Sequence, residues 1–386
     1  MLSYGRQTID EADIAAVVEA LRAPQLTCGP LVGRFETALA TYLGAQHVSV
    51  CSSGTSALHL AYAALGIGEG DEIITTPLTF SATAAAAYYV GATVRIADVD
   101  QRTGNLSIQS VEALITSRTR AIVAVHLAGL PADMAELTQL AKRRRLRIIE
   151  DACHALGATY RGVKVGAGDS DAVVFSFHPV KHITTGEGGA VVVREARVKQ
   201  RIERLRQHGI ERDPACMDGK PDGRWVYEVQ ELGWNYRLSD LSCALGIAQL
   251  AKLDSFLVAR RTLAAQYRTE ISRAFGDAVT VQPEVADRES AYHLLTVAID
   301  FTRHGKTRDV VMGELAELGV GTQVHYVPLL QHPLHAGRNP EERTRPRPGT
   351  DHYYARTLSL PLYPSLTSAD VTHVVDALSR VLGESR

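Results

Sequence analysis

Short apolar runs alternate with longer stretches of helical spacing along the first half of the chain. The apolar runs have the length of strands, and the stretches between them repeat their apolar positions at the period of a helix. Strands are expected at 47–51, 72–75, 93–96, 121–126 and 147–151, and helices at 11–21, 31–43, 56–65, 81–90, 108–115 and 133–145. This alternation predicts an α/β fold with a mainly parallel sheet and helices on both faces.

The alternation stops in the middle of the chain. Two apolar runs, 172–177 and 190–193, have no long helix between them, so we expect a strand pair joined by a polar turn. A long helical pattern then covers 239–273. This helix is expected to lead out of the large sheet and into a second unit.

The C-terminal third predicts a smaller α+β domain. Its expected elements are a strand at 291–299 and helices at 307–318 and 368–382. We therefore expect a large domain at 12–250 and a small domain at 251–386, with residues 1–11 packing on the small domain. The segment 337–350 is rich in Pro, Arg and Glu, which predicts an exposed loop.

Composition narrows the class of protein. The chain has 386 residues, 45% of them hydrophobic and 22% charged, and a formal net charge of −2, which argues against a nucleic acid or membrane partner. The basic run from Lys142 to Arg145 ends a predicted helix, where its charges suit the negative pole of the helix dipole. Five cysteines without a Cys-x-x-Cys spacing argue against a disulfide framework or a metal site. Since the N-terminus also lacks a signal peptide, we expect a cytoplasmic protein with reduced thiols.

A lysine and an aspartate follow two of the predicted strands. Lys181 lies in the turn after 172–177, and Asp151 ends the strand 147–151. This pair suits pyridoxal phosphate (PLP), because the lysine amine bonds covalently to the aldehyde and the carboxylate pairs with the pyridine nitrogen. Either residue alone is explained better as a surface lysine or a strand-end cap. The PLP interpretation depends on both residues and on a phosphate site.

A run of small hydroxyl residues offers that phosphate site. The run from Ser52 to Leu58 lies between the strand 47–51 and the helix 56–65. Free amide groups and the positive dipole end of a helix hold phosphate, so Gly54, Thr55 and Ser56 are candidate ligands, with Ser176 before the lysine as a fourth. Helix capping alone also explains such a run.

These motifs resemble a known family. Nearly the whole chain, 7–382, is similar to the DegT-like nucleotide-sugar aminotransferases, which have the PLP-dependent transferase fold of aspartate aminotransferase (type I). The matching motifs, in order, are Ser53-Gly-Thr-Ser-Ala-Leu58, Glu150-Asp-Ala-Cys-His-Ala-Leu-Gly157, Phe175-Ser-Phe-His-Pro-Val-Lys181, Gly186-Glu-Gly-Gly-Ala190 and Gly233-Trp-Asn-Tyr-Arg-Leu-Ser-Asp240.

The resemblance implies roles for further residues. It makes Lys181 and Asp151 the catalytic pair and places Phe80 on the face of the cofactor ring, with His154 beside it. It implies that Asn235 and Arg237 cross to the cofactor phosphate of a partner subunit, and therefore a homodimer with shared active sites. His178, His325 and Tyr326 would border the sugar-nucleotide pocket, and His208 and Gly209 a loop near the substrate. Core packing or capping explains Phe80, His154, His208 and Gly209 as well, and a solvated loop explains Asn235 and Arg237.

Within the family, three segments look most like the transaminases of pseudaminic acid synthesis: Phe175-Ser-Phe-His-Pro-Val-Lys181, Ile183-Thr-Thr-Gly-Glu-Gly-Gly189 and Gln323-Val-His-Tyr-Val-Pro328. That resemblance implies amination of C4 of UDP-4-keto-6-deoxy-N-acetyl-β-L-altrosamine, with L-glutamate as the amino donor. His182 departs from the proline that is usual in that branch.

Three other interpretations stay open. One is a related aminotransferase acting at C3 or C4 of another UDP- or dTDP-linked keto-sugar. A second is a PLP-dependent sugar dehydratase, against which Lys181 argues because such relatives carry histidine there. The third is a PLP-binding regulatory protein without activity, which the complete set of lysine, aspartate and phosphate cup disfavours.

Overall fold

A seven-stranded sheet organises the first half of the chain in the computed structural model, which describes residues 1–383. Its strand order is β1-β9-β8-β5-β4-β2-β3. Only β9 runs antiparallel to its neighbours, so the predicted mainly parallel sheet is confirmed. The strands are β1 (His47–Cys51), β2 (Glu72–Thr75), β3 (Thr93–Ile96), β4 (Thr119–Val125), β5 (Arg147–Asp151), β8 (Ala172–Ser176) and β9 (Gly189–Val193). The expected strand pair around the lysine turn is β8 and β9.

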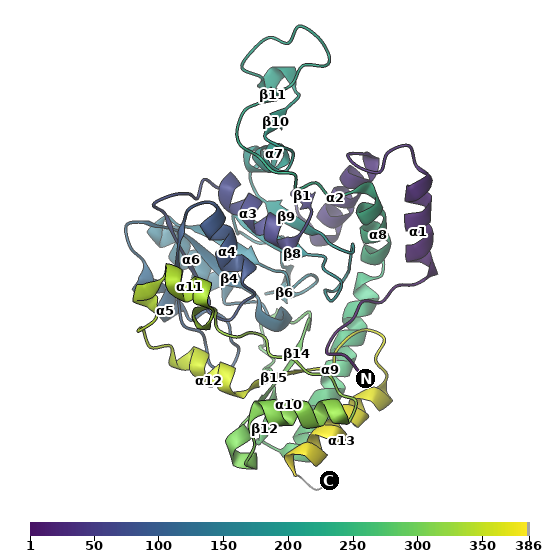
Figure 1. Cartoon of the computed structure of the whole chain (residues 1–386), viewed down its shortest axis with the longest axis vertical. Helices are drawn as coiled ribbons and strands as arrows, with labels where there is room; N and C mark the ends of the chain where they lie inside the picture. Colours follow the sequence, from purple (N-terminus) through teal and green to yellow (C-terminus); the bar gives the residue numbers. More distant parts are fainter. Residues whose placement is uncertain (384–386) are drawn as a thin grey trace.

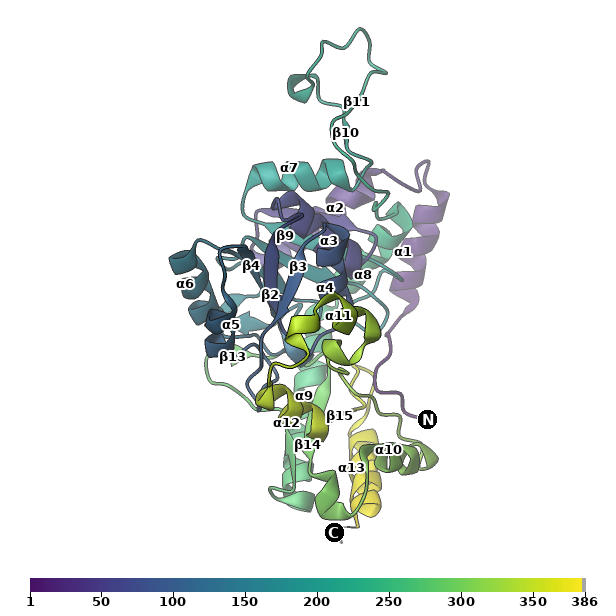
Figure 2. The ribbon, with the colours of Figure 1, turned by 60° about the vertical axis from the view of Figure 1, so that its left-hand side comes forward.

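Helices cover both faces of this sheet (Figures 1 and 2). Successive strand residues point to opposite faces, so that Ile73 packs in one core cluster and Ile74 in another. One face is covered by α3 (Gly54–Ala64), α4 (Ala82–Tyr89) and α7 (Ala196–Leu205). The other face is covered by α2 (Pro30–Leu43), α5 (Ile108–Leu114), α6 (Met134–Arg144) and α8 (Asp240–Leu250), with α1 (Glu11–Arg22) lying against α8.

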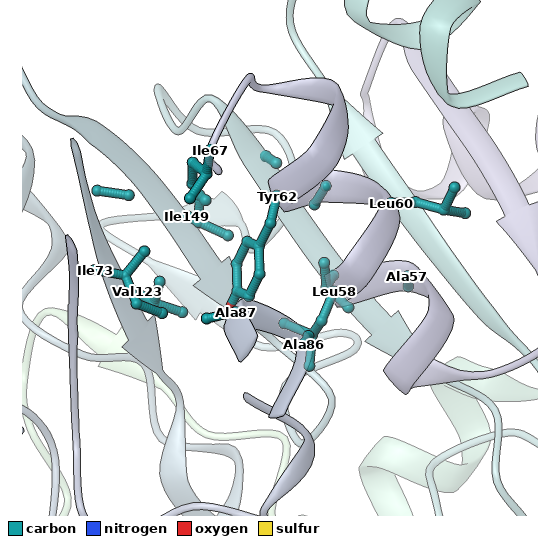
Figure 3. Packing of buried hydrophobic residues seen from close by; sticks show 14 of the residues in the cluster. Ala57, Leu58, Leu60, Tyr62, Ile67, Ile73, Ala86, Ala87, Val123 and Ile149 are labelled. Carbon is teal, nitrogen blue, oxygen red and sulfur yellow. The ribbon is translucent and has the colours of Figure 1, made fainter. Parts of the chain in front are cut away.

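Packing on the first face fixes the position of α4. In Figure 3 the Tyr62 ring points from α3 toward Ala87 of α4. The buried Tyr62 hydroxyl donates a hydrogen bond to the Thr83 carbonyl, with 3.0 Å between the oxygens. This contact sets the height of α4 against the sheet. It thereby places Thr83, whose hydroxyl donates a hydrogen bond to Asp151.

A second unit has its own sheet and core. Strands β12 (Val279–Val281), β14 (Leu295–Ile299) and β15 (Thr357–Leu360) pair antiparallel in the order β12-β14-β15. They pack with α9 (Leu253–Phe275), α10 (Arg308–Glu317) and α13 (Ser368–Leu382) in one hydrophobic cluster. The N-terminal segment reaches this unit, since the Leu2 amide donates to the Gly319 carbonyl and the Leu2 carbonyl accepts from the Gly321 amide. We place the domain boundary between α8 and α9.

The single long helix expected at 239–273 is wrong. Two helices, α8 and α9, meet there at an angle of 56°. At the break the Lys252 ammonium contacts the carboxylates of Asp10 (2.8 Å) and Asp13 (2.6 Å) at the start of α1. Helical periodicity continues through the break, but this long-range ion pair holds the chain at the bend.

The segment 337–350 is exposed at most of its positions, as expected, but it is not one continuous loop. It contains the end of α11 (Pro333–Arg338), the short 3-10 helix η5 (Pro340–Glu342) and the start of α12 (Pro348–Arg356), and several of its polar residues are buried. Glu342 accepts hydrogen bonds from Arg95 (2.7 Å) and Arg347 (2.6 Å), and Arg347 also donates to the Ile96 carbonyl. Glu342 and Arg347 point inward because they pair with each other and with groups of β3, whereas the other charged residues of the segment are exposed.

The remaining elements are short. A three-stranded sheet contains β13 (Arg288–Glu289), β6 (Thr159–Tyr160) and β7 (Val163–Lys164), and 3-10 turns lie at η1 (Leu127–Gly129), η3 (Phe301–His304) and η4 (Leu329–Gln331). A hairpin of β10 (Ile210–Glu211) and β11 (Glu228–Val229), with η2 (Pro214–Cys216) in its loop, projects away from the body in both views. Among residues 1–383, no single helix has the length and apolarity of a membrane span; α8 and α9 meet those criteria only when they are taken together across their bend.

Candidate active site

A cavity of about 830 Å³ lies where the carboxyl ends of the parallel strands face the second unit. The large sheet contributes Val125 at the end of β4, Asp151 at the end of β5 and Ser176 at the end of β8. The opposite wall comes from His293 and the segment 323–327. Ligands of α/β sheets bind at these strand ends, so the cavity lies where the fold predicts a site.

Asp151 is buried at the floor of the cavity and is held by two donors. Its Oδ2 atom accepts a hydrogen bond from the Thr83 hydroxyl at 2.7 Å, and Oδ1 accepts from the Cys153 amide at 3.2 Å. The Thr79 and Thr83 hydroxyls are 2.7 Å apart. Because Thr83 gives its only proton to Asp151, Thr79 must be the donor to Thr83. Two hydroxyls in series therefore hold the carboxylate in one orientation.

Lys181 projects into the same cavity from a tight turn after β8. Its amide donates to the His178 carbonyl, and Phe177 closes the loop through bonds with Thr185 and Gly188. The Nζ atom lies 3.4 Å from His293 Nε2. Burial lowers the pKa of the Lys181 amine, and the nearby Cys153 and Asp151 oppose this shift. An amine with a lowered pKa is a better nucleophile and base near neutral pH.

The phosphate cup forms at the start of α3. Ser53 and Ser56 make a reciprocal capping box, in which each side-chain oxygen accepts from the backbone amide of the other. Gly54 and Thr55 line the cavity between these two residues. A Cβ atom at Gly54 would lie 2.9 Å from Ser176 Cβ, so glycine lets the helix start approach the end of β8. Gly54, Thr55 and Ser176 thus come together as the sequence predicts.

Ser56 does not line this cavity. Its hydroxyl donates to the Ser53 carbonyl at 2.8 Å, and its amide donates to the Ser53 hydroxyl at 3.0 Å. Both groups are therefore used within the helix cap. Ser56 supports the cup through the backbone instead of offering its hydroxyl to the cavity.

Aromatic and imidazole rings form one side of the cavity. His154 Nε2 and the Tyr326 hydroxyl share a hydrogen bond of 2.9 Å, and the two rings stack with 27° between their planes. Burial lowers the pKa of His154 well below its usual value, so this imidazole is neutral. Phe80 also lines the cavity and is 62% exposed, with its ring centroid 6.3 Å from that of Tyr326. Its ring therefore keeps an open face toward a bound molecule.

The three residues expected to contact substrate, His178, His325 and Tyr326, all line the cavity. His178 is exposed on the lysine turn, whereas His325 is buried and its Nδ1 lies 2.8 Å from the Ser359 hydroxyl. Burial lowers the pKa of His325 to about 3, so it is an uncharged hydrogen-bonding group. Tyr326 adjoins it, and burial raises the pKa of its phenol, which stays protonated.

Asn235 and Arg237 do not line this cavity in their own chain. Asn235 is exposed and forms a backbone bridge with Gln207. The neighbouring residues of that loop, Trp234 and Tyr236, line a second cavity of about 470 Å³ together with Ser53, Thr55, Ser56, His59 and Tyr89. This second cavity is open to the surface of the protomer and extends to the start of α3.

His208 and Gly209 also lie away from the cavity. They follow α7 with left-handed φ angles of 61° and 73°. A Cβ atom at Gly209 would lie 1.7 Å from the Glu231 carbonyl oxygen, so the turn requires glycine for a close backbone approach. Within one chain, these two residues therefore position the base of the projecting hairpin.

Sequence reasoning missed Thr83, Cys153 and His293. Thr83 interrupts the alanine-rich helix α4, and such a lone polar residue is a usable signal for a buried hydrogen bond. Cys153 lines the cavity next to Asp151. His293 stands in the apolar run 291–295, which reads as a strand. The structure starts β14 only at Leu295, because Ala291 and Leu294 bond instead to the η1 turn.

The residues present fit PLP. The start of α3 offers amide groups and hydroxyls for a phosphate, and Gly54 leaves the space that a Cβ would fill. A buried carboxylate and a buried amine of lowered pKa line the same cavity. The Nδ1 atoms of His154 and His293 are buried and have no partner among the described residues, which leaves polar groups at the wall for a bound molecule.

A family model described as the DegT/DnrJ/EryC1/StrS aminotransferase family matches residues 7–379. The chain belongs to this family. A Campylobacter jejuni relative named UDP-4-amino-4,6-dideoxy-N-acetyl-beta-L-altrosamine transaminase is 38% identical over 386 residues, covering 99% of this chain and 98% of the relative. The spore coat polysaccharide biosynthesis protein SpsC of Bacillus subtilis is 37% identical over 383 residues, covering 99% and 97%.

Solved structures agree with this assignment. Helicobacter pylori PseC, an aminotransferase involved in the biosynthesis of pseudoaminic acid, superposes with a TM-score of 0.91 at 31% identity, covering 99% of both chains. The PLP form of the sugar aminotransferase Spr1654 of Streptococcus pneumoniae superposes with a TM-score of 0.89 at 26% identity, covering 98% of both. This member of the DegT/DnrJ/EryC1/StrS family is a PLP-dependent sugar aminotransferase, and its substrates are a nucleotide-linked sugar and an amino donor.

Proposed function

We propose that this aminotransferase moves an amino group from L-glutamate to C4 of UDP-4-keto-6-deoxy-N-acetyl-β-L-altrosamine. The observation that carries the proposal is the 38% identity to the Campylobacter jejuni transaminase over nearly the full length of both chains. The likeness of the fold to PseC supports the same substrate class. His325 and Tyr326 line the cavity and are uncharged hydrogen-bonding groups. Such groups suit the recognition of sugar hydroxyls.

A second candidate is amination at C3 or C4 of another UDP- or dTDP-linked keto-sugar. The similarity to SpsC, at 37% identity, favours it almost equally. His182 also bears on this choice, because it replaces a proline beside the cofactor lysine. Its ring is buried, and Nε2 lies 3.1 Å from the Ala291 carbonyl oxygen. The contact ties the lysine turn to the segment that carries His293.

We assign the chemistry to Lys181 and Asp151. The bound cofactor supplies an aldehyde that takes up the amino group and a ring that accepts electrons when a bond at the donor α carbon breaks. Lys181 would hold the cofactor covalently and, once displaced by the donor, would move a proton at its Nζ atom as base and acid. Asp151 would accept a hydrogen bond from the pyridine nitrogen, and its negative charge would favour the protonated ring. Thr83 and the Cys153 amide keep that carboxylate oriented.

We further propose a homodimer with shared sites. Lys181 is the only lysine or arginine among the described residues that line the cavity. A doubly charged phosphate, the substrate diphosphate and the donor carboxylates need cations, and arginine binds such groups with two parallel hydrogen bonds. Arg237 and Asn235 lie outside the cavity of their own chain, beside a second cavity that reaches Thr55. Exposed apolar residues on α1, namely Ile14, Val18 and Leu21, offer a surface for a second copy.

A substrate panel tests the proposed reaction. The purified enzyme is incubated with L-glutamate and each of a set of UDP- and dTDP-linked 4-keto and 3-keto sugars, and the products are identified by mass spectrometry and NMR. We expect the highest kcat/KM with the UDP-linked 4-keto altrosamine derivative. A higher value with another keto-sugar selects the second candidate, and failure of all sugars while glutamate still reacts contradicts both.

Subunit mixing tests the shared site. The Lys181→Ala and Arg237→Ala chains, each nearly inactive alone, are mixed under conditions in which subunit exchange is confirmed with tagged chains. Some heterodimers then carry one intact site, so we expect partial recovery of activity. No recovery despite exchange, or an active monomer in sedimentation analysis, contradicts the shared site.

A further inference from the structure

His293 is held in place by the backbone of both units. The preceding Ala291 amide donates to the Gly129 carbonyl, and the Leu294 amide donates to the Ala128 carbonyl. A Cβ atom at Gly129 would lie 2.9 Å from the His293 amide nitrogen, so the two segments are in direct backbone contact. The buried Arg260 guanidinium donates to the His293 carbonyl at 3.3 Å. The backbone position of His293 is therefore fixed by contacts within the chain itself.

The side chain of His293 has one polar partner. Its Nε2 atom lies 3.4 Å from Lys181 Nζ, and its ring is 4% exposed. The Nδ1 atom is buried without a partner among residues 1–383. In most histidines the hydrogen bond made by one ring nitrogen decides which of the two nitrogens carries the proton. In His293 the Nδ1 atom makes no such bond to any residue of 1–383, so the contact of Nε2 with Lys181 decides where the proton lies.

Several groups face the Lys181 amine, and few of them are charged. They are the carboxylate of Asp151, the thiol of Cys153 and the imidazoles of His154, His182, His293 and His325, with Arg260 behind His293. Burial lowers the pKa of His293 well below its usual value, and the Lys181 charge adds to this effect. His293 is therefore a neutral imidazole at physiological pH.

A neutral imidazole is suited to a lysine that gains and loses a proton. With its proton on Nδ1, the ring offers the Nε2 lone pair, which accepts an N–H from either the amine or the ammonium form. A carboxylate in the same place would raise the lysine pKa by about 1–3 units and hold it as an ammonium. The imidazole keeps the hydrogen bond without adding that charge.

We propose that His293 is a positioning residue that accepts a hydrogen bond from the displaced Lys181 amine and holds it for proton transfer. The lysine lone pair is then free to take a proton at Nζ from the α carbon of the donor, and the resulting ammonium keeps the same partner until it gives the proton up. The proposal rests on the role assigned to Lys181 under the proposed function.

Two amide substitutions test the proposal. In His293→Gln the amide lies near the place of the imidazole Nε2, whereas in His293→Asn it is one methylene short. The glutamate half-reaction is followed in the full-length PLP enzyme by stopped-flow absorbance. We expect the rate to fall about tenfold or more in His293→Asn and to stay within about threefold of wild type in His293→Gln, with the affinity for glutamate unchanged. Tyr292→Phe, a change in the same segment outside the cavity lining, serves as the control and keeps the wild-type rate.

A second readout follows the lysine itself. The full-length enzyme is loaded with pyridoxamine phosphate, which leaves Lys181 as a free amine, and labelled with cyanate across a pH series; the Lys181 peptide is quantified by mass spectrometry. The ammonium form loses its acceptor in His293→Asn, so the labelling midpoint should move about one pH unit lower, a tenfold change, and return in His293→Gln. Equal rates and midpoints in the two variants overturn the proposal.

The two proposals fail in different ways. If the wild-type enzyme does not react with glutamate, or if Lys181→Ala keeps the absorbance of covalently held PLP, the role of Lys181 is wrong. If wild type and Lys181→Ala behave as expected while His293→Asn and His293→Gln give equal rates and equal labelling midpoints, only the positioning role is wrong. Because both variants carry a buried amide, a fold defect would affect them alike and is monitored by thermal unfolding.

Discussion

Replacing Asp151 by asparagine isolates the charge of the carboxylate from its shape. Asp151 is buried, accepts from the Thr83 hydroxyl at 2.7 Å and accepts from the Cys153 amide at 3.2 Å. An asparagine can keep the second bond through its carbonyl oxygen. Its amide would then donate to Thr83, and the proton of Thr83 would turn to Thr79, which lies 2.7 Å away. The hydroxyl chain reverses, so we expect the Asp151→Asn protein to fold.

The expected loss of activity follows from the missing charge. A close opposite charge shifts a pKa by about 1–3 units, and each unit corresponds to about 1.4 kcal/mol. If that energy is lost when electrons move into the ring, the rate of the glutamate half-reaction should fall about 10- to 1000-fold. Some bound cofactor should remain, because the phosphate cup and Lys181 are untouched.

Stopped-flow absorbance of the half-reaction measures this rate, and equilibrium titration with PLP measures cofactor affinity. Thr83→Val is the matched control, because it keeps the carboxylate charge and removes one donor to it. It should cost less than Asp151→Asn, because the carboxylate keeps its charge and its bond to the Cys153 amide, and only part of the roughly 1.5–3 kcal/mol of a hydrogen bond to a charged group is lost. A near-wild-type rate in Asp151→Asn, with unchanged cofactor absorbance, would refute the assigned role.

Three further outcomes test other parts of the site. Lys181→Ala should abolish turnover and leave the thermal unfolding of the protein unchanged within a few degrees; normal turnover would contradict the assignment. Gly54→Ala places a Cβ atom 2.9 Å from Ser176 Cβ, so PLP should bind about tenfold more weakly, measured by titration of the cofactor-free protein. Burial lowers the pKa of Lys181, so the half-reaction rate should rise with pH and level off below the pKa of an ordinary lysine; a plateau only above that value would show that the amine is unperturbed.

The elements of the large sheet could be predicted because their signals are local. Strand β5 ends at Asp151 as expected, and the lysine turn follows β8 as expected. Both depend on apolar runs that a window of sequence contains. The phosphate cup was also local, since the glycine and hydroxyl residues before α3 are neighbours in sequence. Ser56 differs only because the capping box uses its hydroxyl.

The parts that could not be predicted depend on long-range pairs. The segment 337–350 has the composition of a loop, but Glu342 and Arg347 are buried by pairing with each other and with residues around β3. His293 stands in a run that reads as a strand, and only its backbone contact with Gly129 shows that it faces Lys181. Glu342 and Arg95 are 247 residues apart in sequence, and His293 and Lys181 are 112 apart. Such distant partners leave no periodic signal, because each segment looks complete by itself.

The charges around Lys181 support the proposal that a second chain completes the site. Burial keeps His154, His293 and His325 neutral, so the histidines do not supply the cations that a phosphate and a diphosphate need. Extra cations inside the cavity would lower the lysine pKa further, but they would also weaken the interaction of Asp151 with the ring. In the proposed dimer, cations brought by a partner loop to the rim would reach the phosphates while staying away from the amine. This separation is the physical reason to expect Arg237 on the partner side of the phosphate cup and neutral imidazoles beside Lys181.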